Sequence, residues 1–181
     1  MADNLTLTPK EVITARINAT NVAVGASLTP EMLTFGIPDI STGDGNTDLS
    51  VTAVPGSGYT GAETINYDRL HLTTDIANAY VASGAGRDLV FPVGNATTKA
   101  EMVVEVNARL GINLTPDDFI DGPLPEFQGE PNEEIDVQIV ANADSLVYLG
   151  SITIKLKAED IPLSDVIVIK RLTGLTYAPP A

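Results

Sequence analysis

The chain has 181 residues, of which 44% are hydrophobic and 19% are charged. This balance is typical of a globular protein, and the length fits one ordinary domain or two small ones. The net charge of −14 argues against a nucleic-acid-binding protein, because phosphate backbones are bound by basic surfaces. The absence of cysteine excludes disulfides, thiolate catalysis and cysteine-ligated zinc.

The first residues, 1–5, lack the basic and apolar regions of a secretory signal. No apolar run reaches the about 18 residues that cross a bilayer. We therefore expect a soluble protein that is made in a cytoplasm and has no membrane partner.

Helix-start signals open the first half of the chain. Thr8 is a credible N-cap, with Pro9 at the first helical position and Glu11 completing a capping box. Thr29 is followed by Pro30 in the same way. The pattern predicts a helix from Pro9 and a single helical turn from Pro30.

A β-hairpin is predicted next, with strands over 49–54 and 64–72. The glycines of its turn, Gly56, Gly58 and Gly61, match the dinucleotide-binding string G-x-G-x-x-G. That mechanism requires a helix directly afterwards, whereas residues 63–67 have the pattern of a strand. A hairpin turn is therefore the favoured interpretation.

Two further features of the first half could carry chemistry. Residues 44–48 have the D-x-N-x-D opening of a calcium loop, but Leu49 and Pro55 stand where the loop needs Gly and Glu. His71 is the only histidine, and it stands in a strand pattern without a recognisable nucleophile. We interpret the first as a polar turn and the second as structural. The sequence thus predicts no catalytic, cofactor-binding or metal-binding residue, and no enzyme.

The second half repeats these signals. Thr98 and Glu101 form a capping box that predicts a helix over about 98–110, and Thr115-Pro116-Asp117 predicts another single turn. Alternating residues predict strands, at 88–93, 135–140, 151–156 and 166–170.

Three phrases occur twice in the same order. T-x-x-E returns after 90 residues, L-T-P-acid after 86 and Y-x-G-x-x-T-I after 89, at Thr8/Thr98, Leu28/Leu114 and Tyr59/Tyr148. We predict an α+β, β-rich fold with an internal duplication, in which each of two small modules is a short helix plus a hairpin. The modules are residues 1–90 and 91–157, followed by a C-terminal strand and Pro-rich tail over 158–181. We expect Tyr59 and Tyr148 to pack across their hairpins beside a glycine.

Two segments are candidate partner contacts. The region 117–136 contains eight acids and no Lys or Arg, which favours a solvated loop or a docking surface for basic groups over a calcium site. The tail 177–181 cannot extend a helix or a strand ladder. The predicted contact residues are Asp117, Asp118, Glu130, Glu133, Glu134, Tyr177, Pro179 and Pro180.

The phrases T-P-K-E, V-T-A-V-P-G-S-G-Y-T-G, N-A-R-L-G-I-N-L-T-P-D-D-F and V-Y-L-G-S-I-T-I-K-L carry a resemblance over roughly residues 5–157. The chain resembles uncharacterised virion structural proteins of large tailed bacteriophages. The resemblance implies a non-enzymatic particle component on the capsid exterior or in the tail. We expect the chain to be located in the virion, to form homo-oligomers and to bind other capsid or tail proteins.

A head decoration role is the first interpretation, because two related modules can occupy two similar places on a lattice. A tail, collar or baseplate component is the alternative. A carbohydrate- or receptor-binding adhesion module is the second alternative, although the chain contains no Trp and five Tyr.

Overall fold

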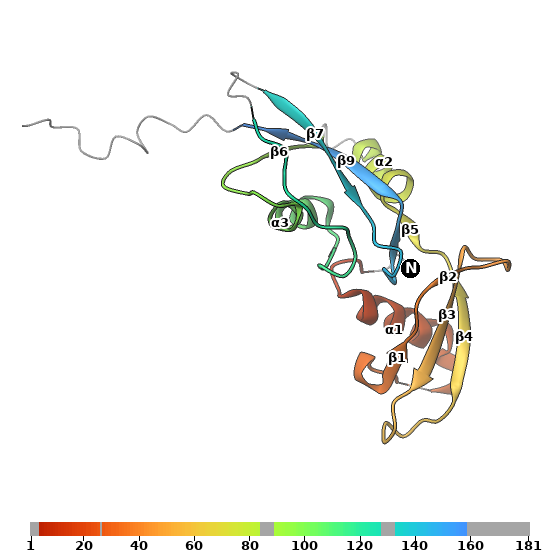
Figure 1. Cartoon of the computed structure of the whole chain (residues 1–181). Helices are drawn as coiled ribbons and strands as arrows, with labels where there is room; N and C mark the ends of the chain where they lie inside the picture. The colour runs from red at the N-terminus through yellow and green to blue at the C-terminus, as the bar shows by residue number, and fades with distance from the viewer. Residues whose placement is uncertain (1–3, 26, 84–88, 128–132, 159–181) are drawn as a thin grey trace, which may run out of the picture.

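The computed structural model describes residues 4–25, 27–83, 89–127 and 133–158. The fold is mixed α+β, as the sequence predicts. Figure 1 shows one helix beside a sheet at each end of the molecule: α1 accompanies β1–β4, and α3 accompanies β6, β7 and β9. The predicted strand 166–170 and the tail lie outside the described residues.

In the first half, strand β3 is the centre of the sheet. Its elements are α1 (Pro9–Thr20), the short 3-10 helices η1 (Val22–Val24) and η2 (Pro30–Met32), and the strands β1 (Leu33–Phe35), β2 (Asp39–Ile40), β3 (Thr47–Ala53) and β4 (Ala62–Tyr67). β4 pairs antiparallel with one side of β3, and β1 and β2 pair antiparallel with the other. Thr47, Leu49 and Val51 of β3 are buried and alternate with more exposed residues, so one face of this sheet is covered.

In the second half of the structure, which begins at Leu70, strand β9 is central. The elements are β5 (Leu70–His71), the π-helix η3 (Leu72–Ala77), α2 (Asn78–Ala82), β6 (Val90–Pro92), α3 (Lys99–Leu110), β7 (Glu134–Val140), β8 (Tyr148–Leu149) and β9 (Ser151–Lys157). β9 pairs parallel with β6 and antiparallel with β7, while β5 and β8 form a separate parallel pair.

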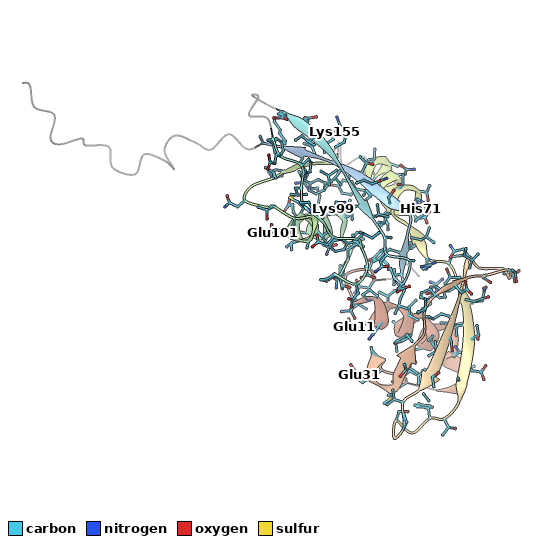
Figure 2. The ribbon with its side chains drawn as sticks, viewed as in Figure 1. Glu11, Glu31, His71, Lys99, Glu101 and Lys155 are labelled. Carbon is cyan, nitrogen blue, oxygen red and sulfur yellow. The ribbon has the colours of Figure 1, made fainter. Side chains whose placement is uncertain are left out.

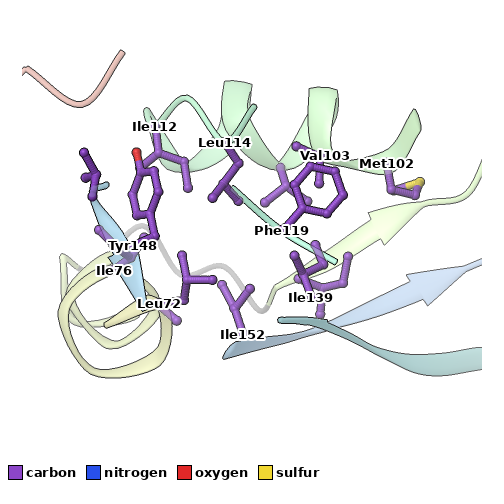
Figure 3. Packing of buried hydrophobic residues seen from close by; sticks show 14 of the residues in the cluster. Leu72, Ile76, Met102, Val103, Ile112, Leu114, Phe119, Ile139, Tyr148 and Ile152 are labelled. Atoms are coloured by element: carbon purple, nitrogen blue, oxygen red, sulfur yellow. The ribbon is translucent and has the colours of Figure 1, made fainter. Parts of the chain in front are cut away.

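Most of the buried apolar side chains belong to the second half. Met102 and Val103 of α3 pack with Phe119 above Ile139 and Ile152 of the sheet (Figure 3). Of the described residues before β5, the buried members of the hydrophobic core are Val12, Ile13, Leu49 and Val51. The first half therefore has the thinner core.

Two predicted elements differ from the structure. The strand predicted over 64–72 ends at Tyr67, because Asp68 and Arg69 bind the preceding turn: Asn46 N donates to Asp68 Oδ1 at 2.8 Å, and Arg69 N donates to Asn46 Oδ1 at 2.9 Å. Helix η3 then begins at Leu72, where the predicted strand was to end. The helical turn predicted at 115–117 is a hydrogen-bonded turn, in which Asp118 N donates to Thr115 O at 2.9 Å.

The repeated phrases make matching local contacts. Asn18 exchanges two hydrogen bonds with the backbone of Leu28, at 2.8 and 3.0 Å, and Asn107 exchanges two with Leu114, both at 2.9 Å. Each pair ties the end of a helix to the L-T-P turn that follows it.

The hairpins also match in register. Ala53 N donates to Gly61 O at 3.0 Å, and Ala141 N donates to Gly150 O at 2.8 Å. Both glycines have positive φ, 94° and 74°. These matches are local, and duplication of the whole module stays a prediction.

The two halves are joined mainly at the loop before β8. Tyr67 Oη donates to Leu146 O at 2.6 Å. The Arg69 guanidinium donates to Ala143 O at 2.9 Å and to Ser145 O at 3.1 Å. Three backbone carbonyls of this loop, those of Ala143, Ser145 and Leu146, thus bind side chains of the first half.

Candidate interaction surfaces

The predicted contact residues Asp117 and Asp118 have different environments. Asp117 is exposed, whereas Asp118 is only 2% exposed. The Asp118 carboxylate accepts hydrogen bonds from Thr115 N at 2.9 Å, Thr115 Oγ1 at 2.6 Å and Ser145 Oγ at 2.6 Å. Its side chain holds two loops together and is not displayed at the surface, so only Asp117 of this pair can meet a partner there.

The acidic residues at the start of β7 lie opposite lysines of β9. Glu134 Oε2 lies 3.4 Å from Lys155 Nζ, and the strand register places Glu134 opposite Lys157 and Asp136 opposite Lys155. Glu133 is partly buried. Both members of the ion pair are exposed, so it adds little stability, but it offsets part of the negative charge predicted for this stretch. Glu130, Tyr177, Pro179 and Pro180 lie outside the described residues.

A groove of about 610 Å³ separates α1 from the outer strand β4. Val12, Ile13 and Ile17 of α1 form one wall, and Ile65 and Tyr67 of β4 form the other. Ile17, Ile65 and Tyr67 are only partly buried. Apolar surface is therefore open to solvent between the helix and the edge of the sheet.

A second cleft of about 450 Å³ lies between the two halves, and Lys10, Phe35, Asp117 and Asp144 are among its lining residues. A third hollow of about 340 Å³ lies beside the first turns of α3, next to Glu101 and Glu105. Large exposed apolar side chains are scattered over several elements, at Val22, Ile37, Ile40, Tyr59, Val81, Val104 and Ile120.

His71 has the structural role that the sequence suggested. Its Nδ1 accepts a hydrogen bond from Thr73 N at 3.2 Å and caps η3. The imidazole also lies directly against Gly150, where a Cβ atom would overlap the ring. His71 is therefore a packing and capping residue at the junction of β5 with the second hairpin (Figure 2).

The repeated tyrosines differ. Tyr148 is 1% exposed, whereas Tyr59 is 41% exposed at the tip of the first hairpin. Burial raises the pKa of Tyr148 and of Tyr67 to about 12. Both phenols stay protonated near neutral pH, so they serve as packing and hydrogen-bonding groups and not as bases.

Three glutamates have lowered pKa values because they accept hydrogen bonds at N-terminal turns. A hydrogen bond from the Thr8 side chain lowers the pKa of Glu11, and one from the Thr29 side chain lowers the pKa of Glu31. Backbone hydrogen bonds from Thr97 and Thr98 lower the pKa of Glu101. These carboxylates, labelled in Figure 2, accept hydrogen bonds at the first turns of helical segments.

The other motifs are loops. Gly56, Gly58 and Gly61 all have positive φ and shape the turn between β3 and β4, as the hairpin interpretation predicts. The loop over 44–48 is held by Asn66, whose Oδ1 accepts from Gly45 N at 2.6 Å and whose Nδ2 donates to Asp48 Oδ1 at 2.8 Å. Within the described ranges, no three His, Cys, Asp or Glu side chains lie close enough to hold a metal ion.

These features define a mixed α+β protein whose open features are sheet edges, grooves and charged loops. The chain belongs to a family of unknown function, DUF7941, which matches residues 2–180. No curated protein and no solved structure matches the chain. Among the described helices, none has the length and apolar character needed to cross a membrane.

Proposed function

We propose that this chain is a non-enzymatic structural protein of a bacteriophage virion that is attached by protein–protein contacts, with decoration of the head as its role. The sequence resemblance to virion proteins of large tailed phages supports this function. The observation that carries this proposal is that the side chains best suited to chemistry make hydrogen bonds inside the protein. His71 and Asp118, which could serve chemistry, are used for internal capping and loop fixation.

The exposed features of the chain are suited to assembly with other protein chains. β4 has one unpaired edge within the described part of the sheet, an apolar groove runs beside it, and the net charge is −14. Exposed strand edges bind further strands through their backbone groups, and a large net charge keeps a concentrated protein from associating indiscriminately.

A place in the tail, collar or baseplate is the alternative within the same class. An adhesion module that binds carbohydrate or a receptor has less support. Such modules usually present aromatic platforms, and Tyr59 is the one large aromatic side chain that is well exposed among the described residues.

Particles of a phage that encodes this chain provide the test. We expect quantitative mass spectrometry of purified particles to find the chain at a fixed ratio to the major capsid protein, and immunogold labelling to mark the head. Labelling confined to the tail would favour the alternative. A chain that is abundant in the lysate and absent from purified particles would rule out a virion function of either kind.

A further inference from the structure

A strand fills the space between helix and sheet edge in the second half. β6 runs parallel to β9: Lys155 N donates to Leu89 O at 2.8 Å, and Val93 N donates to Lys157 O at 3.0 Å. The Phe91 side chain of β6 is completely buried under α3, where the Arg109 guanidinium carbon lies 4.1 Å from the ring centroid. One short strand thus closes this edge and completes the core below the helix.

The corresponding edge of the first half is open. Ala53 N bonds Gly61 O, so the alternating pairs of this antiparallel ladder turn the backbone groups of Ala62, Thr64 and Asn66 away from β3. In the described part of the chain, β4 pairs with β3 alone. Asn66 follows Gly61 at the same separation as Lys155 follows Gly150. Asn66 therefore has the position in the first hairpin that Lys155, which binds β6, has in the second.

When the two hairpins are aligned by their glycines, the groove between α1 and β4 corresponds to the place that β6 fills between α3 and β9. Its volume of about 610 Å³ accommodates several side chains, and Ile65 and Tyr67 on its wall are only partly buried. The thin core of the first half and the open edge therefore share one explanation, which is a missing strand.

We propose that this strand is residues 163–172 of a second copy of the chain, added parallel to β4 as β6 is added to β9. The segment contains Val166–Ile169, four consecutive β-branched residues, which are favoured in strands. Lys170 and Arg171 follow directly. In the parallel orientation they come to the end of the groove that is lined by Asp44 and Asp68, so the charges are complementary.

We assign the strand to a second copy because the described chain ends far from the groove beside β4. β9 runs to Lys157 at the end of the molecule opposite β4 (Figure 1). Each copy donates its C-terminal segment and accepts one from another copy, so the contact either closes as a reciprocal exchange between two copies or continues head to tail as a ring or filament. The proposal holds whether or not the chain is a virion protein.

Disulfide trapping tests the proposal, and the cysteine-free chain gives a clean background. Thr64→Cys is combined in turn with V166C, I167C, V168C and I169C in full-length protein, with two differently tagged versions mixed before oxidation. We expect disulfides between differently tagged chains at alternate positions of the segment, because neighbouring strands align side chains on the same face. Disulfides found only within single chains would overturn the second-copy assignment, and no disulfide at any position would overturn the strand.

A proline pair tests the backbone contact. Thr64→Pro removes an outward N–H of β4, and the matched control Gln138→Pro removes an outward N–H from the outer edge of β7 in the second sheet. We expect sedimentation velocity to show self-association at least about tenfold weaker for Thr64→Pro, since the added strand loses backbone bonds, with the control near wild type. Equal effects of the two prolines, or a wild-type protein that is monomeric at every concentration, would refute the proposal. Circular dichroism confirms that each variant is folded.

Discussion

At Gly150 the backbone and the packing demand glycine for separate reasons. The residue has φ 74°, which costs an ordinary L-residue roughly 1–2 kcal/mol. A Cβ atom would in addition overlap the His71 imidazole. Gly61, its counterpart in the first hairpin, has φ 94° but no heavy atom within 4 Å of the added Cβ position. Comparing substitutions at Gly150 and Gly61 therefore separates the cost of backbone strain from the cost of steric overlap.

We expect Gly150→Ala to destabilise the protein by about 1–3 kcal/mol more than Gly61→Ala, which is the usual cost of overpacking. Urea unfolding of both variants measures the difference. Combining Gly150→Ala with His71→Ala should remove most of the excess, because the overlapping ring is then absent. If the two single variants lose equal stability, the contact between His71 and Gly150 has no energetic weight.

Asp118 and Asp117 form a second comparison at this scale. Asp118→Asn keeps the size of the side chain but turns one acceptor into a donor, which then faces either the Ser145 hydroxyl or the N–H and hydroxyl of Thr115. We expect it to cost about 1–3 kcal/mol, the penalty for a buried polar group left without its partner. Because Asp117 is exposed, Asp117→Asn should change the free energy of unfolding by less than about 0.5 kcal/mol. Thermal unfolding followed by calorimetry checks both values.

The hydrogen bonds of Glu101 should make the stability of the protein depend on pH. Its pKa is lowered because the folded protein gives its carboxylate hydrogen bonds from Thr97 N and Thr98 N. Its contribution to stability is therefore present above the ordinary carboxyl pKa and is lost as the pH falls through the lowered value. We expect Glu101→Gln to be less stable than wild type at neutral pH and equally stable in strong acid.

Thr98→Ala is the control for that experiment, since it removes the hydroxyl that accepts a hydrogen bond from Glu101 N at 3.3 Å. This bond involves no titrating group, and the Thr98 side chain makes only the smallest contribution to the lowered pKa of Glu101, so the loss of about 0.5–2 kcal/mol expected for a missing N-cap should vary much less with pH than the loss for Glu101→Gln. A stability difference for Glu101→Gln that does not vary with pH would contradict the assignment.

At the scale of elements, each helix is tied to its following turn by one asparagine. Asn18 and Asn107 donate to and accept from a leucine backbone, and all four groups lie in partly buried surroundings. The reciprocal bonds fix the direction in which the chain leaves the helix. The same device occurs where the sequence repeats, although the two helices bury different amounts of apolar surface.

We expect Asn107→Ala and Asn18→Ala each to cost about 1–3 kcal/mol, because the leucine backbone groups lose their partners. Asn21→Ala is the matched control, since Asn21 is exposed and its Nδ2 donates to Ile17 O at the end of α1. Chemical denaturation ranks the three variants. A loss of stability for only one of Asn18→Ala and Asn107→Ala would mean that the two asparagines do not stabilise their helix ends equally.

Elements with local signals were predictable from the sequence. The capping boxes gave the starts of α1 and α3, and alternation gave β3, β7 and β9. The helical segment that follows His71 was missed, because its start depends on an imidazole cap and on Asp75 accepting from His71 N. The parallel pairs β5–β8 and β6–β9 join residues far apart in the chain, and no local pattern encodes them.

The surfaces were harder to predict than the fold. Asp117 and Asp118 are adjacent acids, and only the tertiary structure separates the exposed one from the buried one. The groove beside β4 has no sequence signature either, since it is formed by α1 and an edge strand that lie about fifty residues apart.

At the scale of the whole molecule, the two halves are coupled through the loop before β8. Arg69 reaches across this boundary: its Nε donates to Thr47 Oγ1 at 3.0 Å, while its Nη1 donates to Ala143 O and Ser145 O. Hydrogen bonds from a charged donor are stronger than neutral ones. Arg69 thus couples β3 to the second hairpin, and the first half depends on the second because its own core is thin.

We expect Arg69→Met to lower stability by about 2–4 kcal/mol, since two carbonyls and one hydroxyl lose a charged donor, and to uncouple the halves. In calorimetry the van't Hoff enthalpy should fall below the calorimetric enthalpy, the sign of a transition that is no longer two-state. Hydrogen exchange should speed up first in β3 and β4, while β7 and β9 stay protected. Arg109→Met is the control, because Arg109 bonds Val90 O and stacks on Phe91 inside the second half; it should destabilise the protein without splitting the transition. Uniformly faster exchange in Arg69→Met would show instead that the two halves unfold as one unit even without this bridge.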